Sequence, residues 1–391
     1  MYTLSVVRAY YYRLYPTAAQ VRTLGRMMEL LRVIYNAALQ ERRDAYRLQH
    51  ISITKREQEK SLTEIKRDCP EYKAVHTHLL QDATTRLDRA FGSFFRRIKE
   101  GKKPGFPRFK GIGRYRTFMF KDAAHGNGAR FVAGGKRIEF SGIGKVKVKI
   151  HRPWEGRIKQ IGVTLDGDGH WYAIVVCDDV PEKILPKTGE TVGVDVGIAD
   201  FLVTSDGDHV PNPRPLEVAK ISVERAQRKV SRRKRGGTNR RKAVALLSKQ
   251  HAHVRNVRKD FHHKEAVKLV RRYDAIAIED LNILGLARGW LAKQVHDVAW
   301  GGFANITAYK AESAGRELVR VDPRGTTQEC SGTLPDGSRC PAIVPKTLKE
   351  RRHTCSLCGL DIDRDENAAG VVHWRAYAQG PGRGLRVGAA A

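Results

Sequence analysis

The chain has 391 residues, and its 72 Lys+Arg against 42 Asp+Glu give a formal net charge of +30. This length exceeds that of one typical compact domain and favours two or three. At 41% hydrophobic, the composition supplies buried cores and excludes general disorder. Thirty excess positive charges repel one another unless a polyanion neutralises them, so nucleic acid is the first expected partner and an anionic membrane surface the second.

The sequence argues against a membrane or secreted protein. It contains no uncharged apolar run of about 18 residues, and residues 1–15 carry Arg8 and Arg13 among aromatics, without the apolar segment of a secretory signal. Six cysteines are too few for a disulfide scaffold, and four of them lie between residues 330 and 358. We therefore expect a metal-binding cytoplasmic protein with no membrane partner.

In the first half of the chain, a strand is predicted over residues 4–14. Thr17 can cap the helix that follows, whose apolar positions recur at helical spacing as far as residue 48. A second helical pattern covers residues 75–98, and the Pro- and Gly-containing basic segment 101–110 ends it. Between residues 117 and 177, alternating apolar residues and glycine turns predict strands with lysines on the outward face; a solvated face and a nucleic-acid surface both remain open for those lysines.

In the second half, residues 181–190 form a plausible linker. Strands are predicted at 192–196, 201–204 and 275–278, with a long helical region between the last two. A helix near 301–315, the cysteine cluster and a short helix from Glu366 complete an α/β domain with an inserted metal knuckle. The tail, residues 379–391, is rich in Gly, Ala and Arg and is expected to be disordered.

The positive charge is concentrated in one stretch. Residues 220–272 contain 19 Lys+Arg and 3 Asp+Glu, a net of +16 out of the total +30. A solvated helical hairpin is one interpretation. Because so one-sided a charge would destabilise a free hairpin by repulsion, we favour contact with phosphates. The basic residues at its centre are Arg232, Arg233, Lys234, Arg235, Arg240 and Arg241.

Three acidic motifs lie at the ends of predicted elements. In residues 193–197 (GVDVG), strand alternation places Asp195 on the same face as two glycines, which leaves room for a metal ion and a phosphate. Residues 274–280 end a second short strand in Glu279, and residues 361–369 crowd acids at the start of a helix. Each motif alone could be an ordinary strand end or helix cap. Two-metal hydrolysis of a phosphodiester, however, needs carboxylates that converge from different elements.

The cysteine set predicts a structural zinc site. Cys355 and Cys358 form a C-x2-C-G knuckle that can place two thiolates on one tetrahedral Zn²⁺. The partner half is looser, because nine residues separate Cys330 from Cys340. Buried free cysteines are the alternative, and His353 is close enough to replace one ligand.

The motifs, taken in their order along the chain, resemble those of the TnpB family. These are transposon-encoded RNA-guided nucleases related to the type V CRISPR effectors. The resemblance runs from residues 13–20 and 33–36 through 105–110, 193–198, 231–234 and 278–281 to 355–369. Two departures stand out: the first zinc half is C-x9-C where the family usually has C-x2-C, and Gly370 and the two following valines replace the usual Asn-Ile.

The resemblance implies an α/β nuclease domain, RuvC-like and of RNase H fold with a zinc-ribbon insertion, beside an N-terminal β-barrel wedge domain that carries a helical recognition insertion. The implied boundaries are 1–15 for the first wedge strand, 16–103 for the recognition domain, 104–185 for the wedge β domain, 186–325 for the nuclease domain, 326–360 for the zinc insertion, 361–378 for the third nuclease motif and 379–391 for the tail.

The resemblance also implies roles for individual residues. Asp195, Glu279 and Asp365 match the acids that hold two Mg²⁺ ions, with Asp363 as a flanking residue. Cys330, Cys340, Cys355 and Cys358 match the ligands of one structural Zn²⁺. Residues implied to contact nucleic acid in the N-terminal half are Thr77, His78, Gln81, Arg108 and Lys110.

The function implied is an RNA-guided DNA endonuclease that cleaves DNA complementary to its guide, next to a short adjacent motif. Its expected partners are a guide RNA derived from the transposon end and double-stranded target DNA, bound by a monomeric prokaryotic protein at the nucleoid. The alternatives are a nuclease-inactive RNA-guided repressor and a zinc-ribbon nucleic-acid-binding accessory protein. A transposase fits less well, because its acids run Asp, Asp, Glu and these run Asp, Glu, Asp.

Overall fold

The computed structural model describes residues 6–132, 134–347, 349–377 and 385–386. The chain divides into two compact units, Met1–Pro181 and Glu182–Ala391. The division falls at the start of the predicted linker, and residues 181–190 lie outside helices and strands. None of the helices in the described ranges has the length and apolar character needed to cross a bilayer.

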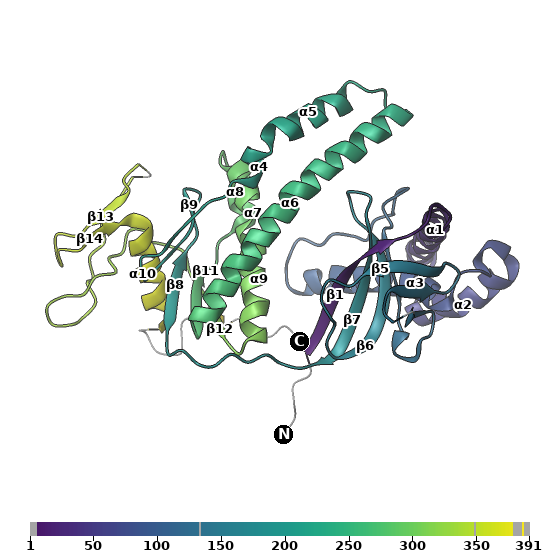
Figure 1. Ribbon diagram of the computed structural model, residues 1–391, viewed down its shortest axis with the longest axis horizontal. Helices are drawn as coiled ribbons and strands as arrows, with labels where there is room; N and C mark the ends of the chain where they lie inside the picture. Colours follow the sequence, from purple (N-terminus) through teal and green to yellow (C-terminus); the bar gives the residue numbers. More distant parts are fainter. Residues whose placement is uncertain (1–5, 133, 348, 378–384, 387–391) are drawn as a thin grey trace. The chain divides into compact units, whose positions relative to one another are not determined.

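The first unit is a sheet with helices packed against it (Figure 1). All seven strands pair antiparallel, in the order β2-β6-β7-β1-β5-β4-β3. Among the described residues, no ladder joins the edge strands β2 and β3, so strand pairing does not close the predicted barrel. The strands are β1 (Val6–Tyr15), β2 (Thr117–Phe120), β3 (Ala129–Val132), β4 (Arg137–Phe140), β5 (Gly144–Lys149), β6 (Arg157–Leu165) and β7 (Trp171–Val180).

Three helices contribute to the core of this unit. Helix α1 (Ala18–Gln49) begins after Thr17, whose hydroxyl accepts the backbone N–H of Gln20, so the predicted cap is confirmed. Helix α3 (Thr77–Lys99) confirms the second helical pattern, whereas α2 (Lys55–Asp68) was not predicted. The buried faces of α1 and α3 pack with the apolar strand residues in one continuous core.

The second unit contains a mixed sheet in the order β10-β9-β8-β11-β12-β15. Strands β8 (Thr191–Asp195), β11 (Ala275–Glu279) and β12 (Glu317–Val321) are parallel neighbours. Strands β9 (Asp200–Thr204), β10 (His209–Pro211) and β15 (Leu385–Arg386) pair antiparallel at the two sides. The remaining residues of the tail, 379–384 and 387–391, lie outside the described residues; the pairing of β15 with β12 departs from the expected disorder.

Helices cover both faces of this sheet (Figure 1). The isoleucines and valines of β8 and β11 pack against α6 (Thr238–Arg272) and α9 (Trp300–Ser313). On the opposite face, Ala277 and Val319 pack with Val372 of α10 (Arg364–Tyr377). The alternation predicted for the two strands is therefore confirmed, and both faces are buried, as expected for parallel strands.

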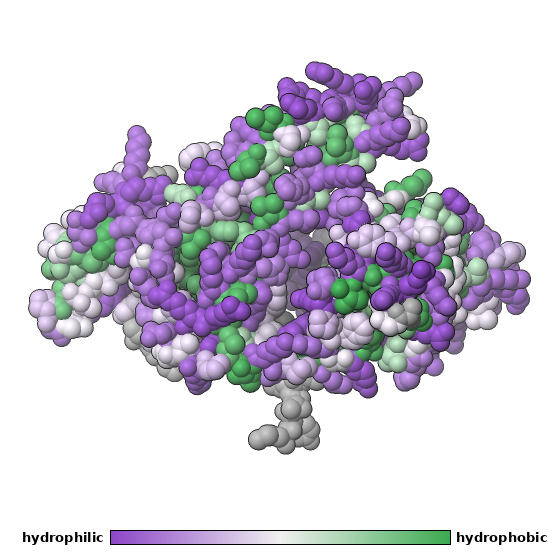
Figure 2. Space-filling model, viewed as in Figure 1, coloured by the Kyte–Doolittle hydropathy of each residue, from purple (hydrophilic) through white to green (hydrophobic). Residues whose placement is uncertain are grey.

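The other elements of the second unit are short except for one hairpin. Helix α5 (Lys220–Ser231) and α6 form the predicted basic hairpin, which projects from the sheet (Figure 1), and its visible surface is mostly hydrophilic with a few hydrophobic residues (Figure 2). The short elements are α4 (Pro215–Val218), α7 (Ile283–Leu286), α8 (Ala292–Val298), β13 (Arg352–Thr354) and β14 (Asp361–Asp363).

Candidate functional sites: a carboxylate cluster and a cysteine cluster

Two of the predicted acids end adjacent parallel strands. Asp195 is the last residue of β8, and Glu279 is the last residue of β11. The strands are in register through the pair Val194 and Ile278, so the two acids follow at the same level. Because the strands are parallel, both carboxylates emerge at one edge of the sheet.

The third acid reaches this edge from a helix. Asp365 lies in the first turn of α10, and Asp363 caps that helix, since its Oδ1 accepts the backbone N–H of Asp365 at 2.7 Å. Helix α10 packs directly on β8: a Cβ added to Gly193 would lie 2.1 Å from the carbonyl oxygen of Ala369. This corrects our prediction that Gly193 leaves room for a metal and a phosphate. Its missing side chain admits the helix that carries Asp365.

The three acids form one electrostatic cluster. Asp195 is buried, and burial raises its pKa well above the usual range; the negative charges of Glu279 and Asp365 raise it further, while Arg364 opposes the shift. Burial also raises the pKa of Glu279, against the lowering effect of its hydrogen bond from Thr326. The protein thus holds at least two carboxylates where their ionised forms are costly, an arrangement common at functional sites.

Other side chains hold two of these carboxylates in place. The Thr326 hydroxyl donates a hydrogen bond of 2.6 Å to Oε1 of Glu279. Arg364 forms an ion pair of 2.8 Å with Asp365, and Arg351 approaches the same carboxylate at 3.5 Å. The sequence offered no signal for Thr326, which lies 47 positions from Glu279 along the chain.

The residue types suit a hard divalent cation, although among the described residues only the four cysteines bring their ligand atoms within 4.8 Å of one another, so the carboxylates would have to draw together around an ion. Carboxylate oxygens are the protein ligands that Mg²⁺ prefers, and a cation among them would offset the mutual repulsion that raises the pKa of Asp195. Asp195, Glu279 and Asp365 are the residues that could hold such ions.

The four predicted cysteines converge on one point. Their sulfur atoms all lie within 4.8 Å of one another, with Cys330 and Cys358 at 3.5 Å and Cys340 and Cys355 at 3.7 Å. Tetrahedral zinc with Zn–S bonds of about 2.3 Å places its sulfurs about 3.8 Å apart. The cluster is therefore compatible with zinc, and Cys340 belongs to it despite its unusual spacing.

Nearby residues make this convergence possible. A Cβ on Gly332 would lie 2.8 Å from the sulfur of Cys358 and 3.4 Å from that of Cys330, so only glycine fits here without displacing a sulfur. His353 is fully buried, but its Nδ1 contacts the Lys346 ammonium group, and it is not among the four converging residues. The alternative in which His353 replaces a cysteine is not the arrangement seen.

The cysteine cluster and the carboxylate cluster are physically joined. The Asn367 side chain, buried on α10, accepts the N–H of Ser331 at 2.9 Å and donates to the carbonyl of Glu329 at 2.8 Å. A Cβ on Gly370 would lie 2.7 Å from Cβ of Ser331. The departure at Gly370 thus marks the place where the cysteine segment packs on α10, two turns or less from Asp365.

The nucleic-acid residues predicted in the first unit lie near its second long helix and the preceding loop. Thr77 and His78 begin α3, and Gln81 follows one turn later, with its carbonyl accepting a hydrogen bond from Lys121. Arg108 is exposed in the irregular segment after α3. Lys110 is fixed there by backbone hydrogen bonds to the Asn36 side chain.

The basic residues predicted in the second unit lie at the tip of the hairpin. The run from Arg232 to Arg235 links α5 to α6 and is exposed, and Arg241 is exposed as well. Arg240 differs, because its guanidinium donates to the carbonyls of Val230 and Arg233 at the end of α5. Part of its role is therefore to cap that helix.

Three family models match successive segments of the chain. A family model described as "Probable transposase" matches residues 174–289, one described as "Cas12f1-like, TNB domain" matches residues 300–372, and one described as "Helix-turn-helix domain" matches residues 1–50. In the last segment, the described residues form strand β1 and the single helix α1 instead of two helices.

Whole-chain relatives and a solved structure agree. A protein of Streptomyces pristinaespiralis named "Putative RNA-guided DNA endonuclease" is 31% identical over 370 residues, covering 93% of this chain and 88% of its own. The Escherichia coli protein InsQ, similarly named, is 23% identical and is covered over 90% of its length. The structure of a Cas12f1-sgRNA-target DNA complex matches over 94% of this chain and 99% of its own, with a TM-score of 0.57 and 13% identity, so it shares the fold.

The chain therefore shares the fold of that Cas12f1 structure, and its residues 300–372 match the Cas12f1-like TNB domain family. It belongs to the TnpB family of RNA-guided DNA endonucleases.

Proposed function

We propose that the protein is a transposon-encoded, RNA-guided DNA endonuclease whose nuclease site is formed by Asp195, Glu279 and Asp365. The observation that carries this proposal is that three acids from three separate elements lie close enough at one edge of the sheet for Glu279 and Asp365 to raise the pKa of the buried Asp195. A surface that only binds nucleic acid gains nothing from negative charge at such a position.

The protein's own residues prepare this site for phosphodiester hydrolysis. Two Mg²⁺ ions bound by these carboxylates would activate water and stabilise the leaving oxygen. Thr326 orients Glu279, and Arg364 and Arg351 restrain the carboxylate of Asp365 through ion pairs. Burial of Asp195 excludes bulk water, which strengthens every electrostatic interaction in the site.

The other parts of the protein have structural and recognition roles. In this proposal, the second unit is a RuvC-like domain of RNase H fold with a structural zinc at the four cysteines. The first unit is the wedge and recognition portion. The guide RNA supplies sequence specificity by base pairing, while the protein contacts backbone and shape and reads a short motif beside the target. Such a protein would work in the prokaryotic cytoplasm, at the nucleoid, as a monomer with one RNA.

The experiment is cleavage of guide-matched DNA in the presence of Mg²⁺. Asp195→Ala should abolish cleavage while guide-RNA binding and target binding stay nearly intact, because Asp195 is a buried acid and not one of the exposed basic residues of the hairpin. Cleavage retained by this variant would contradict the assignment. Binding without cleavage by the unaltered protein would instead favour the nuclease-inactive repressor.

A further inference from the structure

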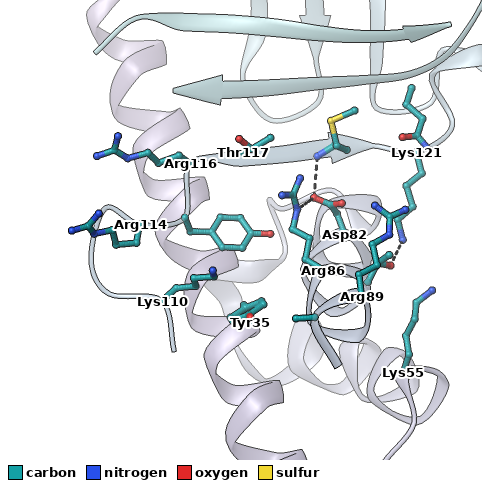
Figure 3. A pocket seen from close by; sticks show the side chains of 15 residues that line it. Tyr35, Lys55, Asp82, Arg86, Arg89, Lys110, Arg114, Arg116, Thr117 and Lys121 are labelled. Atoms are coloured by element: carbon teal, nitrogen blue, oxygen red, sulfur yellow. Dashed lines mark hydrogen bonds and ion pairs between the residues drawn. The ribbon is translucent and has the colours of Figure 1, made fainter. Parts of the chain in front are cut away.

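The first unit contains a cavity of about 710 Å³ that no part of the nuclease mechanism uses (Figure 3). Its walls come from α1, α2, α3, β2, β6 and the segments on either side of β2. A cavity of this volume can hold one nucleotide or a short stretch of polynucleotide backbone.

The cavity is strongly cationic. Seven lysine and arginine side chains line it, against a single carboxylate, Asp82. That carboxylate is already bound, since Arg86 pairs with it at 2.7 Å and the backbone N–H of Met119 donates to it at 3.1 Å. The other six cations have no carboxylate within the cavity, and of these Lys55 pairs with Glu59 outside it at 3.5 Å. Burial lowers the pKa of Lys121 and the nearby charge of Lys55 lowers it further, as expected where positive charges crowd together.

Several donors around the cavity are uncommitted. In the described ranges of the chain, the side chains of Arg89 and Arg114 have neither a hydrogen bond nor an ion pair, and Arg116 uses only Nε, to the carbonyl of Gly113. All three are exposed; Figure 3 shows Arg114 and Arg116 extended outward, away from Asp82 and Arg86, so these two must turn to reach a ligand in the cavity. Guanidinium groups in this state are suited to phosphate oxygens.

A buried hydroxyl completes the set. Tyr115 lines the cavity with only 6% of its surface exposed, and its hydroxyl has no hydrogen-bond partner among the described residues. Burial raises its pKa, so the group keeps its proton and remains a donor. A buried hydroxyl without a partner is costly, and a ligand oxygen would remove that cost.

The aromatic rings do not offer a base-stacking surface. The Lys110 ammonium lies over the ring of Tyr35 at 5.5 Å, and the Arg86 guanidinium lies over the ring of Tyr115 at 5.8 Å. With these faces covered, what the cavity presents is hydrogen-bond donors and positive charge. That chemistry recognises a phosphodiester and not a particular base.

We propose that this cavity is a phosphate-binding site that holds a phosphodiester of a single-stranded polynucleotide backbone, through Arg89, Arg114, Arg116 and the Tyr115 hydroxyl. The proposal rests on the proposed function only for the source of the strand, which is either the guide RNA or the target DNA. Binding there is independent of base sequence and weakens as salt rises.

The first test uses Tyr115→Phe, which removes only the hydroxyl. The probes are short oligouridine and oligodeoxythymidine, measured with the protein alone, and guide-matched DNA, measured with the protein–RNA complex. We expect affinity to fall about tenfold or more in at least one arm, the value of one hydrogen bond to a charged acceptor. The melting temperature of the free protein should stay level or rise, because an unsatisfied buried hydroxyl is gone.

The second test removes charge at the rim. Arg89→Gln with Arg114→Gln should reduce the slope of log affinity against log salt by about 0.7 for each phosphate that the variant no longer neutralises. The matched control is Arg67→Gln, an exposed cation of α2 that already pairs with Asp68 at 2.7 Å. That variant should bind like the unaltered protein.

The arms identify the strand and separate this proposal from the nuclease assignment. An effect confined to RNA places the guide in the cavity, and an effect confined to the guided complex places target DNA there. Unchanged affinity and salt slope in every arm, or a Tyr115→Phe variant that loses stability, would overturn the site. Because the oligonucleotide arms need no cleavage, a protein that binds them through this cavity but cuts nothing would contradict only the proposed function.

Discussion

The cysteine cluster and the carboxylate cluster lie in the same unit and share a connecting segment, yet they are prepared for cations in different ways. The four sulfurs already stand at the separations of a tetrahedral site, and Gly332 leaves the space they need. The carboxylates are instead restrained by other partners, Thr326 and Arg364, and the pKa of Asp195 is raised. Four protein ligands that complete the coordination suit a permanent structural ion. Carboxylates that repel one another and leave coordination positions free suit ions that must also bind substrate.

The joining residues suggest that one cluster depends on the other. Asp365 follows the cysteine segment directly, and Asn367 ties that segment to α10. We therefore expect damage at the cysteines to reach the carboxylates, and damage at the carboxylates to leave the cysteines intact. The following predictions test this asymmetry, beginning with the largest expected effect.

Replacing one of the four cysteine ligands should cause the largest loss of stability and cleavage. Cys355→Ser is expected to lose zinc and several kcal/mol of stability, since zinc affinity in such sites is coupled to folding, and cleavage should fall with it. Zinc content, thermal unfolding and cleavage would be measured together. The control is Cys69→Ser, a cysteine of the first unit outside the cluster, which should keep its zinc and most of its stability. A Cys355→Ser protein with full zinc content would refute the ligand assignment.

The contact between α10 and β8 gives the next largest effect. Gly193→Ala places a Cβ 2.1 Å from the Ala369 carbonyl oxygen, so the helix must move, at a cost of about 3 kcal/mol. Cleavage should drop sharply because Asp365 moves with the helix, while zinc remains bound. In Gly25→Ala, by contrast, the new Cβ of α1 meets nothing within 4 Å, and stability should rise by up to about 1 kcal/mol. Normal cleavage by Gly193→Ala would show that α10 does not set the carboxylate geometry.

The hydrogen bonds of Asn367 come third. Asn367→Ala leaves a buried N–H at Ser331 and a carbonyl at Glu329 without partners, which should cost about 2 kcal/mol. Zinc should stay bound, because no sulfur ligand changes. If the two clusters are coupled as proposed, cleavage falls more than target binding does. Equal losses in both measurements would point to general destabilisation instead.

The smallest expected effect is a gain in thermal stability, where the preceding substitutions lower it. Because the pKa of Asp195 is raised in the folded protein, the folded state favours the protonated form, and stability is lost as pH rises from the ordinary Asp range through the raised pKa. Asp195→Asn should therefore melt about 2–4 °C higher than the unaltered protein near neutral pH without metal. Added Mg²⁺ should stabilise the unaltered protein and leave the variant largely unchanged. A lower melting temperature for the variant would contradict the proposal that ionised Asp195 destabilises the folded state.

Much of this arrangement was accessible from the sequence. Periodicity identified α1 and α3, with a predicted cap only at α1, alternation identified β8 and β11, and the spacing of the cysteines identified their cluster. These signals are local, because they reflect the geometry of one helix, one strand or one knuckle. The resemblance to the TnpB family selected Asp365 from the several acids that begin α10.

The contacts between distant segments were not accessible in this way. Gly193 looked like space for a ligand, and only packing shows that a helix fills it. Thr326 and Asn367 make their bonds to residues 47 and 36–38 positions away, and no local pattern specifies such pairs. The cavity of the first unit is assembled from five helices and strands and the segments beside β2, and no single contiguous motif marks it.

The position of Asp365 near the end of the chain has a consequence for synthesis. The ribosome makes the chain from the N-terminus, so the basic hairpin and the first two acids exist before the third. A nascent or truncated chain that stops ahead of α10 can carry every cationic surface described above and still lack one of the three carboxylates. Such a chain could hold nucleic acid but, under the proposed mechanism, could not cut it.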